Sequence, residues 1–420
     1  MRKTKIVCTI GPSCSDKKTL TEMAKAGMNI ARLNFSHGTH EEHLKKINLI
    51  KEIRDELNLP IAILLDTKGP EYRIKTFKNG KEILKDGEEF TFTTREVEGT
   101  DKIVSVSYPM LHEEVKPGDR ILVKNKVLKQ VYLSEQDKAD IEFGIKNDID
   151  FIACSFVSCR QDLVDVKNFI GTSGDVGIIA KIENRSGIDN IEEICEECEG
   201  IMIGRGDMGV EIPFEDLPAI QKQLITKCRL LGKRVITATE MLEISDVANA
   251  VYDGTSAIML SGETAAGKYP VLTVRTMARI AERTEESVHY ARRFREADFQ
   301  IKNTVDAISH ATVGMAIDIG AKVIAACTLS GSTARMISRF RPPVDVLGIT
   351  TNKKTWYKLA LSWGVVPCLT DVYESTDVLF YTAKQKTEEM FNLKEGEHIV
   401  ITGGTSGAVG NTNLIKIETV

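Results

Sequence analysis

The feature that most constrains the fold is a regular alternation of short apolar segments with longer amphipathic ones along most of the chain. Near-continuous runs of Val, Ile, Leu and Ala are typical of strands buried on both faces of a parallel sheet, and the amphipathic segments suit helices that cover those faces. Eight such runs in succession predict a closed (β/α)8 TIM barrel. The runs span residues 5–10, 29–35, 61–67, 151–156, 177–183, 200–206, 234–239 and 257–261.

Two departures from this alternation divide the chain. Between residues 72 and 133 the helical period disappears, and short strand-like pieces separated by turns predict an inserted all-β lid module. Residues 1–71 and 134–295 would then form the barrel, which a single long helix over 269–293 closes. Residues 296–420 predict a separate C-terminal α/β domain with an open sheet. Three units agree with a length of 420 residues, which is too long for one ordinary core.

The composition excludes several classes of partner. The formal net charge is −5, so bulk attraction to nucleic acid or to an anionic membrane is not expected. No apolar stretch is long enough to span a bilayer, and the N-terminal residues lack the apolar core of a signal peptide. We therefore expect a cytoplasmic protein without nucleic-acid or membrane partners, in which any phosphate is held by local charges, metal ions or backbone N–H groups.

The nine cysteines favour the same compartment. Most lie in apolar runs, where a free cysteine acts as a small buried hydrophobic residue, and an odd number in an unsecreted chain indicates a reducing cytosol. Cys195 and Cys198 form the only CxxC pair, in an expected acidic helix without a second pair or a nearby histidine. We interpret this pair as structural rather than as a metal or redox site.

Polar residues gather where the eight expected strands end, and the C-terminal ends of the strands carry the chemistry of TIM barrels. Any one of them alone would be read as a solvated rim charge or a helix cap. Their convergence indicates a site, because burying several unpaired charges together is costly. The residues are Arg32, Asn34, Ser36, His37, Asp66, Thr67, Lys68, Lys181, Glu183, Asn184, Arg205, Asp207, Thr239, Ser261 and Glu263.

These residue types favour phosphate together with a divalent cation. Lys181 and Glu183 are two positions apart, so a strand places both on one face. Glu183 and Asp207 suit Mg²⁺, which takes one or two carboxylates and otherwise uses substrate oxygens and water. Arg32 and Lys181 can hold a phosphoryl group, whose transfer requires charge neutralisation more than covalent help.

Long motifs then identify a family. KTKIVCTIGPS, GMNIARLNFSHG, LLDTKGPE, IIAKIENRSGIDN, GIMIGRGDMGVEIP, VITATEML and DGTSAIMLSGETAAGKYPV resemble pyruvate kinases in the family's order. NTVDAISHAT, SGSTARMISRFRP and WGVVP extend the resemblance over nearly the whole chain. It implies transfer of a phosphoryl group from phosphoenolpyruvate to ADP, which gives pyruvate and ATP. It also implies Mg²⁺ or Mn²⁺, K⁺, a phosphorylated small-molecule effector and a homotetramer.

The resemblance assigns roles to matching positions. Glu183 and Asp207 resemble the Mg²⁺ ligands, while Lys181 and Arg32 resemble the residues that stabilise the phosphoryl group. The substrate carboxylate would meet Gly206, Asp207 and Thr239, and Thr239 also lies near the route by which the enolate is protonated. The nucleotide contacts would be Asn34, His37 and Arg73, with Arg73 as a second phosphate-facing arginine. The K⁺ site would comprise Asn34, Ser36, Asp66 and Thr67, and Glu71 is the residue that accompanies K⁺ dependence in the family.

The expected C-terminal domain carries a second candidate site. Thr328, Ser330, Ser332 and Thr333 end a strand and open a helix, where hydroxyls and free N–H groups can bind an anion. The family binds its phosphorylated effector at this place, and an ordinary helix cap is the alternative. The glycine-rich segment 403–410 is not a dinucleotide fingerprint, because a strand follows it where that motif requires a helix.

Two stretches are shorter than the family pattern. The inserted module omits most of its second half, and residues 237–243 join directly to 244–250 without a Pro- and Arg-rich helical segment. We expect the barrel helix after residue 243 to lose its approach. Either the deletions are genuine, which an intact mass near 46.5 kDa would support, or the natural protein has residues that this sequence lacks.

Two other functions stay open. One is a Mg²⁺-dependent lyase or aldolase of the related phosphoenolpyruvate/pyruvate barrels, which lack the insertion, the segment 64–71 and the C-terminal domain. The other is a regulatory relic that binds phosphorylated metabolites without turnover. The sequence retains the full set of candidate catalytic residues, Arg32, Lys181, Glu183, Asp207 and Thr239. This argues against a relic, since a protein without turnover need not retain every one of them.

Overall fold

The centre of the computed structural model is a closed barrel of eight parallel strands. The structure describes residues 1–70, 74–85, 87–108, 111–116, 132–238, 244–373, 375–404 and 412–420. Each barrel strand pairs with its neighbour along the chain, and the first pairs with the last to close the circle, so all eight predicted strands are confirmed. They are β1 Lys5–Thr9, β2 Ile30–Asn34, β3 Ala62–Asp66, β6 Phe151–Cys154, β7 Gly177–Ile182, β8 Gly200–Gly204, β9 Arg234–Ala238 and β10 Ala257–Leu260.

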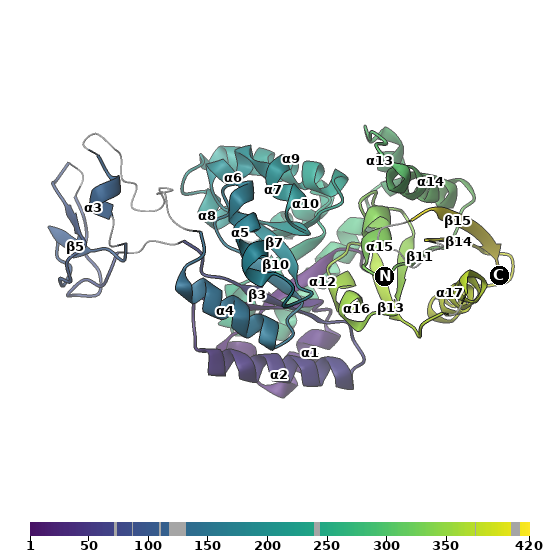
Figure 1. Cartoon of the computed structure of the whole chain (residues 1–420), viewed down its shortest axis with the longest axis horizontal. Helices are drawn as coiled ribbons and strands as arrows, with labels where there is room; N and C mark the ends of the chain where they lie inside the picture. Colours follow the sequence, from purple (N-terminus) through teal and green to yellow (C-terminus); the bar gives the residue numbers. More distant parts are fainter. Residues whose placement is uncertain are drawn as a thin grey trace.

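Alternate side chains of these strands fill two apolar layers. Ile6 and Cys8 face the surrounding helices, whereas Val7 between them joins the inner cluster of the barrel. In Figure 1 the helices surround the strands. They are α1 Lys17–Lys25, α2 His40–Glu56, α4 Glu135–Lys146, α5 Arg160–Ile170, α6 Arg185–Asp189, α7 Ile191–Glu196, α8 Arg205–Met208, α9 Leu217–Leu230, α10 Ile244–Asp253, α11 Gly262–Ala265 and α12 Pro270–Glu286.

The expected helix over 269–293 is two helices. After α12 ends at Glu286, the chain turns at residues 287–289 and continues as α13 Tyr290–Glu296. Two hydroxyls close the end of α12 by donating to backbone carbonyls one turn back: Thr284 Oγ1 bonds Ile280 O at 2.8 Å and Ser287 Oγ bonds Thr284 O at 2.7 Å. Such bonds compete with continuation of the helix.

The shortened connection after β9 does not remove the next helix. Helix α10 forms, packs against α12 and buries Val247, Ala250 and Val251. The prediction that this helix loses its approach concerns the residues before it; the helix itself forms because its apolar face still packs on the barrel core. The connecting residues 239–243 lie outside the described part of the chain.

The insertion lies to one side of the barrel (Figure 1). Two short parallel strands, β4 Thr91–Thr93 and β5 Ile103–Ser105, confirm its β character. The side chain of Ser105 ties the loop before β5, because its hydroxyl accepts the Val97 N–H at 2.7 Å and donates to the Arg95 carbonyl at 2.6 Å. A short helix, α3 Leu111–Glu114, departs from the all-β prediction. Residues 117–131 of the insertion lie outside the described residues.

The C-terminal domain is the predicted open sheet, with strand order β13-β12-β11-β14-β15. Four strands are parallel and β15 is antiparallel to β14. Helices cover both faces: α14, α15 and α16 lie over one apolar cluster and α17 over the other. The elements are β11 Val323–Cys327, β12 Asp345–Thr350, β13 Val365–Leu369, β14 His398–Gly403, β15 Leu414–Thr419, α14 Thr304–Asp318, α15 Ser332–Ser338, α16 Lys353–Leu359 and α17 Thr376–Phe391.

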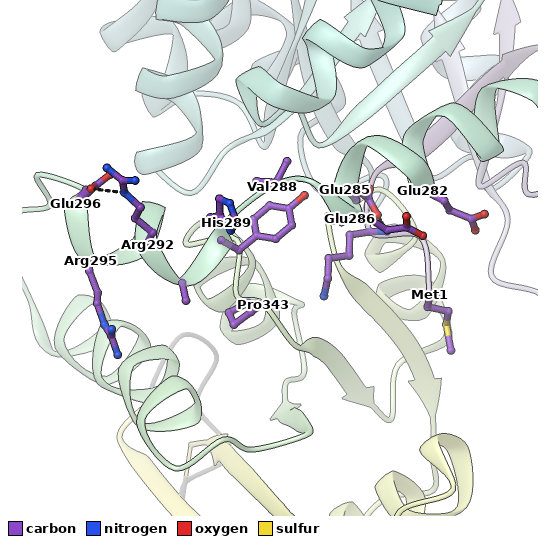
Figure 2. A pocket seen from close by; sticks show the side chains of 13 residues that line it. Met1, Glu282, Glu285, Glu286, Val288, His289, Arg292, Arg295, Glu296 and Pro343 are labelled. Atoms are coloured by element: carbon purple, nitrogen blue, oxygen red, sulfur yellow. Dashed lines mark hydrogen bonds and ion pairs between the residues drawn. The ribbon is translucent and has the colours of Figure 1, made fainter.

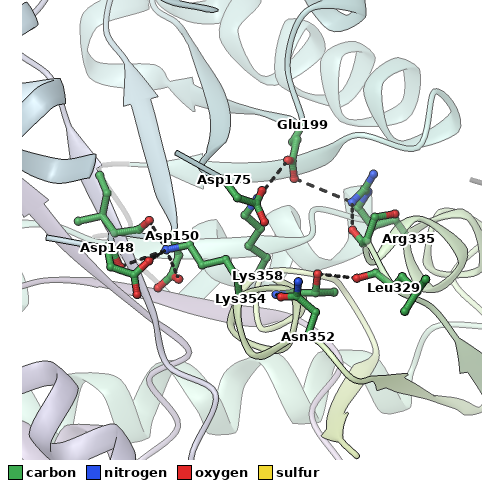
Figure 3. Close-up of polar contacts among 12 residues, drawn as sticks. Asp148, Asp150, Asp175, Glu199, Leu329, Arg335, Asn352, Lys354 and Lys358 are labelled. Atoms are coloured by element: carbon green, nitrogen blue, oxygen red, sulfur yellow. Dashed lines mark hydrogen bonds and ion pairs between the residues drawn. The ribbon is translucent and has the colours of Figure 1, made fainter. Parts of the chain in front are cut away.

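Helix α16 fastens this domain to the end of the barrel where the strands begin. Figure 3 shows Lys354 reaching from α16 to Asp148 and Asp150. Its Nζ lies 2.7 Å from Asp148 Oδ1, 2.5 Å from the carbonyl of Ile149 and 3.3 Å from Asp150 Oδ1. Asp150 is fully buried, and its other oxygen accepts the Ile63 N–H at 2.7 Å. The buried Asp150 carboxylate therefore has two cations, Lys354 of the C-terminal domain at Oδ1 and Arg54 of the barrel, whose Nη1 lies 3.1 Å from Oδ2.

A second contact at this interface centres on Glu199, which precedes β8. Its carboxylate lies 2.7 Å from Arg234 Nη1 of the barrel, 3.8 Å from Lys358 Nζ and 3.9 Å from Arg335 Nη1 of the C-terminal domain. Burial would raise the pKa of Glu199, but these three cations outweigh it and lower the pKa to about 2. Glu199 is therefore a permanent negative charge shared by both domains.

In the described part of the chain, every helix falls short of the length and apolarity that a membrane crossing requires.

The Lys354 contact predicts a large difference between two adjacent lysines. Lys354→Met should lower the free energy of unfolding by about 2 kcal/mol, because it leaves Asp150 Oδ1 buried without a partner while Arg54 still pairs with Oδ2. Lys353→Met should cost less than about 1 kcal/mol, because the Lys353–Asp55 pair is mostly exposed. Urea unfolding of both variants measures the difference, and equal losses would contradict this account of the interface.

Candidate active site at the barrel mouth

The inward-facing rows of the barrel change from apolar to charged at the C-terminal ends of the strands. Ile30, Leu64 and Ile179 belong to the inner apolar cluster. Two positions further along the same strands, and therefore on the same face, stand Arg32, Asp66 and Lys181. Each lies directly above a closed apolar interior, so the charges have only one another and the open mouth as partners.

Arg32 is fixed by two contacts. Its Nε donates to Asp66 Oδ2 at 2.6 Å, and its Nη1 donates to Thr9 Oγ1 at 2.8 Å. Burial would raise the pKa of Asp66, but the charges of Arg32 and Lys181 outweigh burial and lower it. The Asp66 carboxylate is therefore ionised and holds the guanidinium at the barrel mouth.

Lys181 sits between two carboxylates and a hydroxyl. Its Nζ lies 3.1 Å from Asp66 Oδ1, 3.1 Å from Glu183 Oε1 and 2.7 Å from Ser155 Oγ. Burial would lower the pKa of Lys181, but Asp66 and Glu183 together raise it to about 12. Lys181 is consequently a fixed ammonium suited to stabilise negative charge, and it cannot serve as a base near neutral pH.

Glu183 is 1% exposed, and both of its oxygens have a neighbour. Oε1 faces Lys181, while Oε2 accepts the backbone N–H of Phe156 at 2.8 Å. Phe156 adopts a φ of 56°, in the left-handed region that costs energy for a residue with a side chain. Burial raises the pKa of Glu183 to about 7, the charges of Asp207 and Asp66 add to this rise, and Lys181 opposes it.

Gly204 is required beside this carboxylate. A Cβ at Gly204 would lie 2.7 Å from Glu183 Cγ, which is closer than side chains can approach. The glycine at the end of β8 thus makes room for Glu183 and lets the chain turn into α8, where Gly206 and Asp207 are exposed.

The donors fit a divalent cation that completes its shell from elsewhere. Glu183 and Asp207 offer carboxylate oxygens, the hard ligands that Mg²⁺ prefers. Among the described residues, no three His, Cys, Asp or Glu side chains come together as a metal cluster. The two carboxylates of Glu183 and Asp207 suit Mg²⁺, which retains water or substrate oxygens around one or two protein carboxylates.

The predicted K⁺ residues lie on neighbouring strands. Asn34 and Asp66 are direct partners in the pairing of β2 with β3. The Asn34 side chain accepts the Ser36 N–H at 3.2 Å, which orders the loop after β2. Thr67 directly follows Asp66 and is buried, so the four predicted residues lie at or just past the ends of two paired strands. His37, three residues after Asn34, is exposed.

Several predicted positions cannot be placed in this site. Arg73, Thr239 and Glu71 lie outside the described residues. Arg205 pairs with Asp246 at 3.8 Å. Glu263 Oε2 accepts the Ser261 N–H at 2.8 Å and closes the turn after β10.

Sequence reasoning missed three residues that hold the site together. Thr9, Ser155 and Phe156 each contact Arg32, Lys181 or Glu183. All three lie at or just past the end of a strand, so the rule that found the other residues could have found them. They were read as parts of apolar runs, because a small hydroxyl or a backbone N–H carries no charge pattern.

The loop that leads into α15 carries the four hydroxyl residues of the predicted effector site, Thr328, Ser330, Ser332 and Thr333. Gly331 adopts a φ of 80° where the chain turns into α15. The hydroxyl of Thr333 is buried and lies 2.7 Å from that of Thr412. Thr328 is buried, while Ser330 and Ser332 are half-buried. Arg335 Nη1 donates to the Ser330 carbonyl at 3.3 Å, so this loop also touches the residue that faces Glu199.

One cavity lies away from the barrel mouth. It has a volume of about 1130 Å³ and is lined mainly by the end of α12, by α13 and by Pro343 (Figure 2). Its lining mixes glutamates such as Glu285 with Arg292 and Arg295, and it includes none of the predicted site residues. We place the active site at the barrel mouth, because the charged network there is buried and mutually oriented.

Comparison with known proteins agrees with the architecture. Residues 1–132 and 125–274 match the family profile of the pyruvate kinase barrel domain, and residues 306–418 match that of the pyruvate kinase alpha/beta domain. A pyruvate kinase of Staphylococcus epidermidis is 42% identical over all of this chain and 81% of its own length. One of Clostridium acetobutylicum is 40% identical over the whole of both chains.

A solved structure leads to the same family. A crystal structure of a pyruvate kinase from Cryptosporidium parvum superimposes with a TM-score of 0.90 at 32% identity, covering 100% of this chain and 96% of the other. The alignment with the Clostridium relative spans 472 positions against 420 residues in this chain, so the relative has residues that this chain lacks. The chain belongs to the pyruvate kinase family.

Proposed function

We propose that this protein transfers the phosphoryl group of phosphoenolpyruvate to ADP and so produces pyruvate and ATP. The observation that carries the proposal is the buried network in which Asp66 and Glu183 hold Lys181 beside Arg32 at the barrel mouth. Family membership supports the same reaction. Residues 1–71 and 134–295 would carry catalysis, residues 72–133 would cover the site, and residues 296–420 would bind an effector.

The network can perform the central task of phosphoryl transfer, which is to neutralise charge. Lys181 remains an ammonium across the physiological pH range and can face both the moving phosphoryl group and the developing enolate oxygen. Arg32, fixed by Asp66 and Thr9, presents its guanidinium to a phosphate. A divalent cation bound by Glu183 and Asp207 would supply further positive charge.

The remaining roles follow the family pattern. The backbone at Gly206 and Asp207, with Thr239, would hold the substrate carboxylate, and Thr239 would take part in protonation of the enolate. Asn34, His37 and Arg73 would contact the nucleotide, and the exposure of His37 agrees with a place at the entrance. We also propose a cytoplasmic homotetramer.

Replacement of Lys181 tests the mechanism. Lys181→Met should lower kcat for ADP-dependent pyruvate formation by at least about 10²-fold, because the variant loses the positive charge that faces the transition state. Lys17→Met, which removes an exposed lysine on α1, is the matched control and should leave kcat unchanged. A lactate dehydrogenase-coupled assay with Mg²⁺ and K⁺ gives the rate. Equal turnover by Lys181→Met and the parent would refute the mechanism, and a wild-type protein without ADP-dependent transfer would favour the lyase alternative.

Replacement of the monovalent cation tests the proposed K⁺ site. Asn34, Ser36, Asp66 and Thr67 supply neutral oxygens and one carboxylate, which suit a large monovalent cation. Activity should fall to a small fraction when Na⁺ or Tris⁺ replaces K⁺ at constant ionic strength, because these ions do not match the site. Full activity without K⁺ would contradict the assignment.

A phosphorylated effector is proposed for the loop of Thr328, Ser330, Ser332 and Thr333. The left-handed Gly331 and the two half-buried serines leave this turn open to an anion, whereas Thr333 is engaged by Thr412. Sugar phosphates and nucleotides added in turn to the coupled assay should include one that shifts the half-saturating phosphoenolpyruvate concentration. Ser332→Asp should abolish that shift, because it places a negative charge where the phosphate binds. An unchanged response in this variant would place the effector elsewhere.

A further inference from the structure

Ser155 occupies a position between the two halves of the proposed site. It follows β6, the barrel strand between β3 and β7. Its side chain is 1% exposed, although it lies at the polar mouth of the barrel. Asp66 and Thr67 stand on one side of it and Lys181 on the other.

The hydroxyl of Ser155 joins these neighbours. It accepts a hydrogen bond from Lys181 Nζ at 2.7 Å and donates to the carbonyl of Thr67 at 2.6 Å. A hydroxyl has one proton and two lone pairs. The short bond to Thr67 takes the proton, so a lone pair faces the ammonium. Asp66 Oδ1 lies 3.3 Å from Ser155 Oγ, but it pairs with the Lys181 ammonium instead.

The backbone around Ser155 fixes the hydroxyl in this position. The Ser155 N–H donates to Thr67 Oγ1 at 3.3 Å, and the Ser155 carbonyl accepts the hydroxyl of Tyr132 at 2.7 Å. The Thr67 hydroxyl donates to the Ala153 carbonyl. The Thr67 carbonyl, which has a second lone pair, is thus the oxygen of this residue suited to a cation.

We propose that Ser155 is a positioning residue that couples the monovalent cation at Asp66 and Thr67 to the orientation of Lys181. This inference rests on the proposed function. The Ser155 hydroxyl orients the Thr67 carbonyl from one side and the Lys181 ammonium from the other. Without it, the ammonium is held only by Asp66 and Glu183, and the carbonyl loses the donor that fixes its direction.

A purely structural role is the competing explanation. A Cβ on Gly69 would lie 2.8 Å from Ser155 Cβ, so the loop 67–69 packs closely against this residue. Ser155→Ala retains that Cβ and removes only the hydroxyl. Ser155→Cys retains the approximate volume but replaces the hydroxyl with a weak donor and acceptor. If packing alone mattered, both variants would resemble the parent.

The experiment compares the parent, Ser155→Ala, Ser155→Cys and Ser158→Ala in the holoenzyme with Mg²⁺. Ser158 lies on the same loop, and its hydroxyl contacts the Phe156 carbonyl and the Asn184 amide, so it is a matched control. The coupled assay is run over a KCl series, with tetramethylammonium chloride keeping the ionic strength constant. The second readout, which needs no turnover, is the rise in Tm that KCl produces without substrates.

Both Ser155 variants should lower kcat by about 10²-fold, because a small misplacement of a charge costs this much. They should also raise two KCl concentrations by about tenfold: the one that gives half of the activation and the one that gives half of the Tm rise. Loss of a residue that orients a ligand of a bound cation has an effect of this size. Ser158→Ala should change neither concentration.

An unchanged half-activating KCl concentration in both Ser155 variants would overturn the coupling, even with a reduced kcat. If Ser155→Ala does not fold, the Tm series with Ser155→Cys decides the question. An inactive wild type would instead refute the proposed function, while the Tm series would still test the link between Ser155 and the cation.

Discussion

The buried ammonium of Lys181 is the interaction on which the rest of the site depends. A lysine above an apolar barrel interior is tolerable only if carboxylates surround it, and Asp66 and Glu183 do so at 3.1 Å each. Those carboxylates are then available to fix Arg32 and, as proposed, to bind metal ions. The closed barrel imposes this arrangement, because Arg32, Asp66 and Lys181 stand on the inward-facing rows near the C-terminal ends of β2, β3 and β7, which open at the same mouth.

The sequence predicted the elements that depend on local pattern, and it missed those that depend on distant partners. All barrel strands were predicted, since near-continuous apolar runs fit a sheet covered on both faces. Lys181 and Glu183 were found because charge at a strand end is conspicuous. Ser155 was not found, since its importance comes from Thr67 and Lys181 on two other strands. The break between α12 and α13 was missed because the amphipathic pattern continues across residues 287–289.

The interface between barrel and C-terminal domain gives the proposed effector loop a physical route to the active site. Arg335 touches both the Ser330 carbonyl of that loop and Glu199. Glu199 also holds Arg234, the first residue of β9, and directly precedes β8. The far ends of these strands lead to Gly204, Asp207 and Thr239. A change in the loop that draws Arg335 away would therefore alter the charge balance at the base of two site-bearing strands.

Substrate binding and exclusion of water are assigned to different parts of this chain. The charges that would bind phosphate, Arg32 and Lys181, are held by the carboxylates of Asp66 and Glu183. The cover above them would come, as proposed, from the insertion, and the sequence is shorter than the family pattern both there and after residue 238. Because water exclusion strengthens every electrostatic interaction inside a closed site, a reduced cover weakens transition-state stabilisation more than initial binding. The barrel can therefore keep affinity for its substrates while the surrounding segments set the rate.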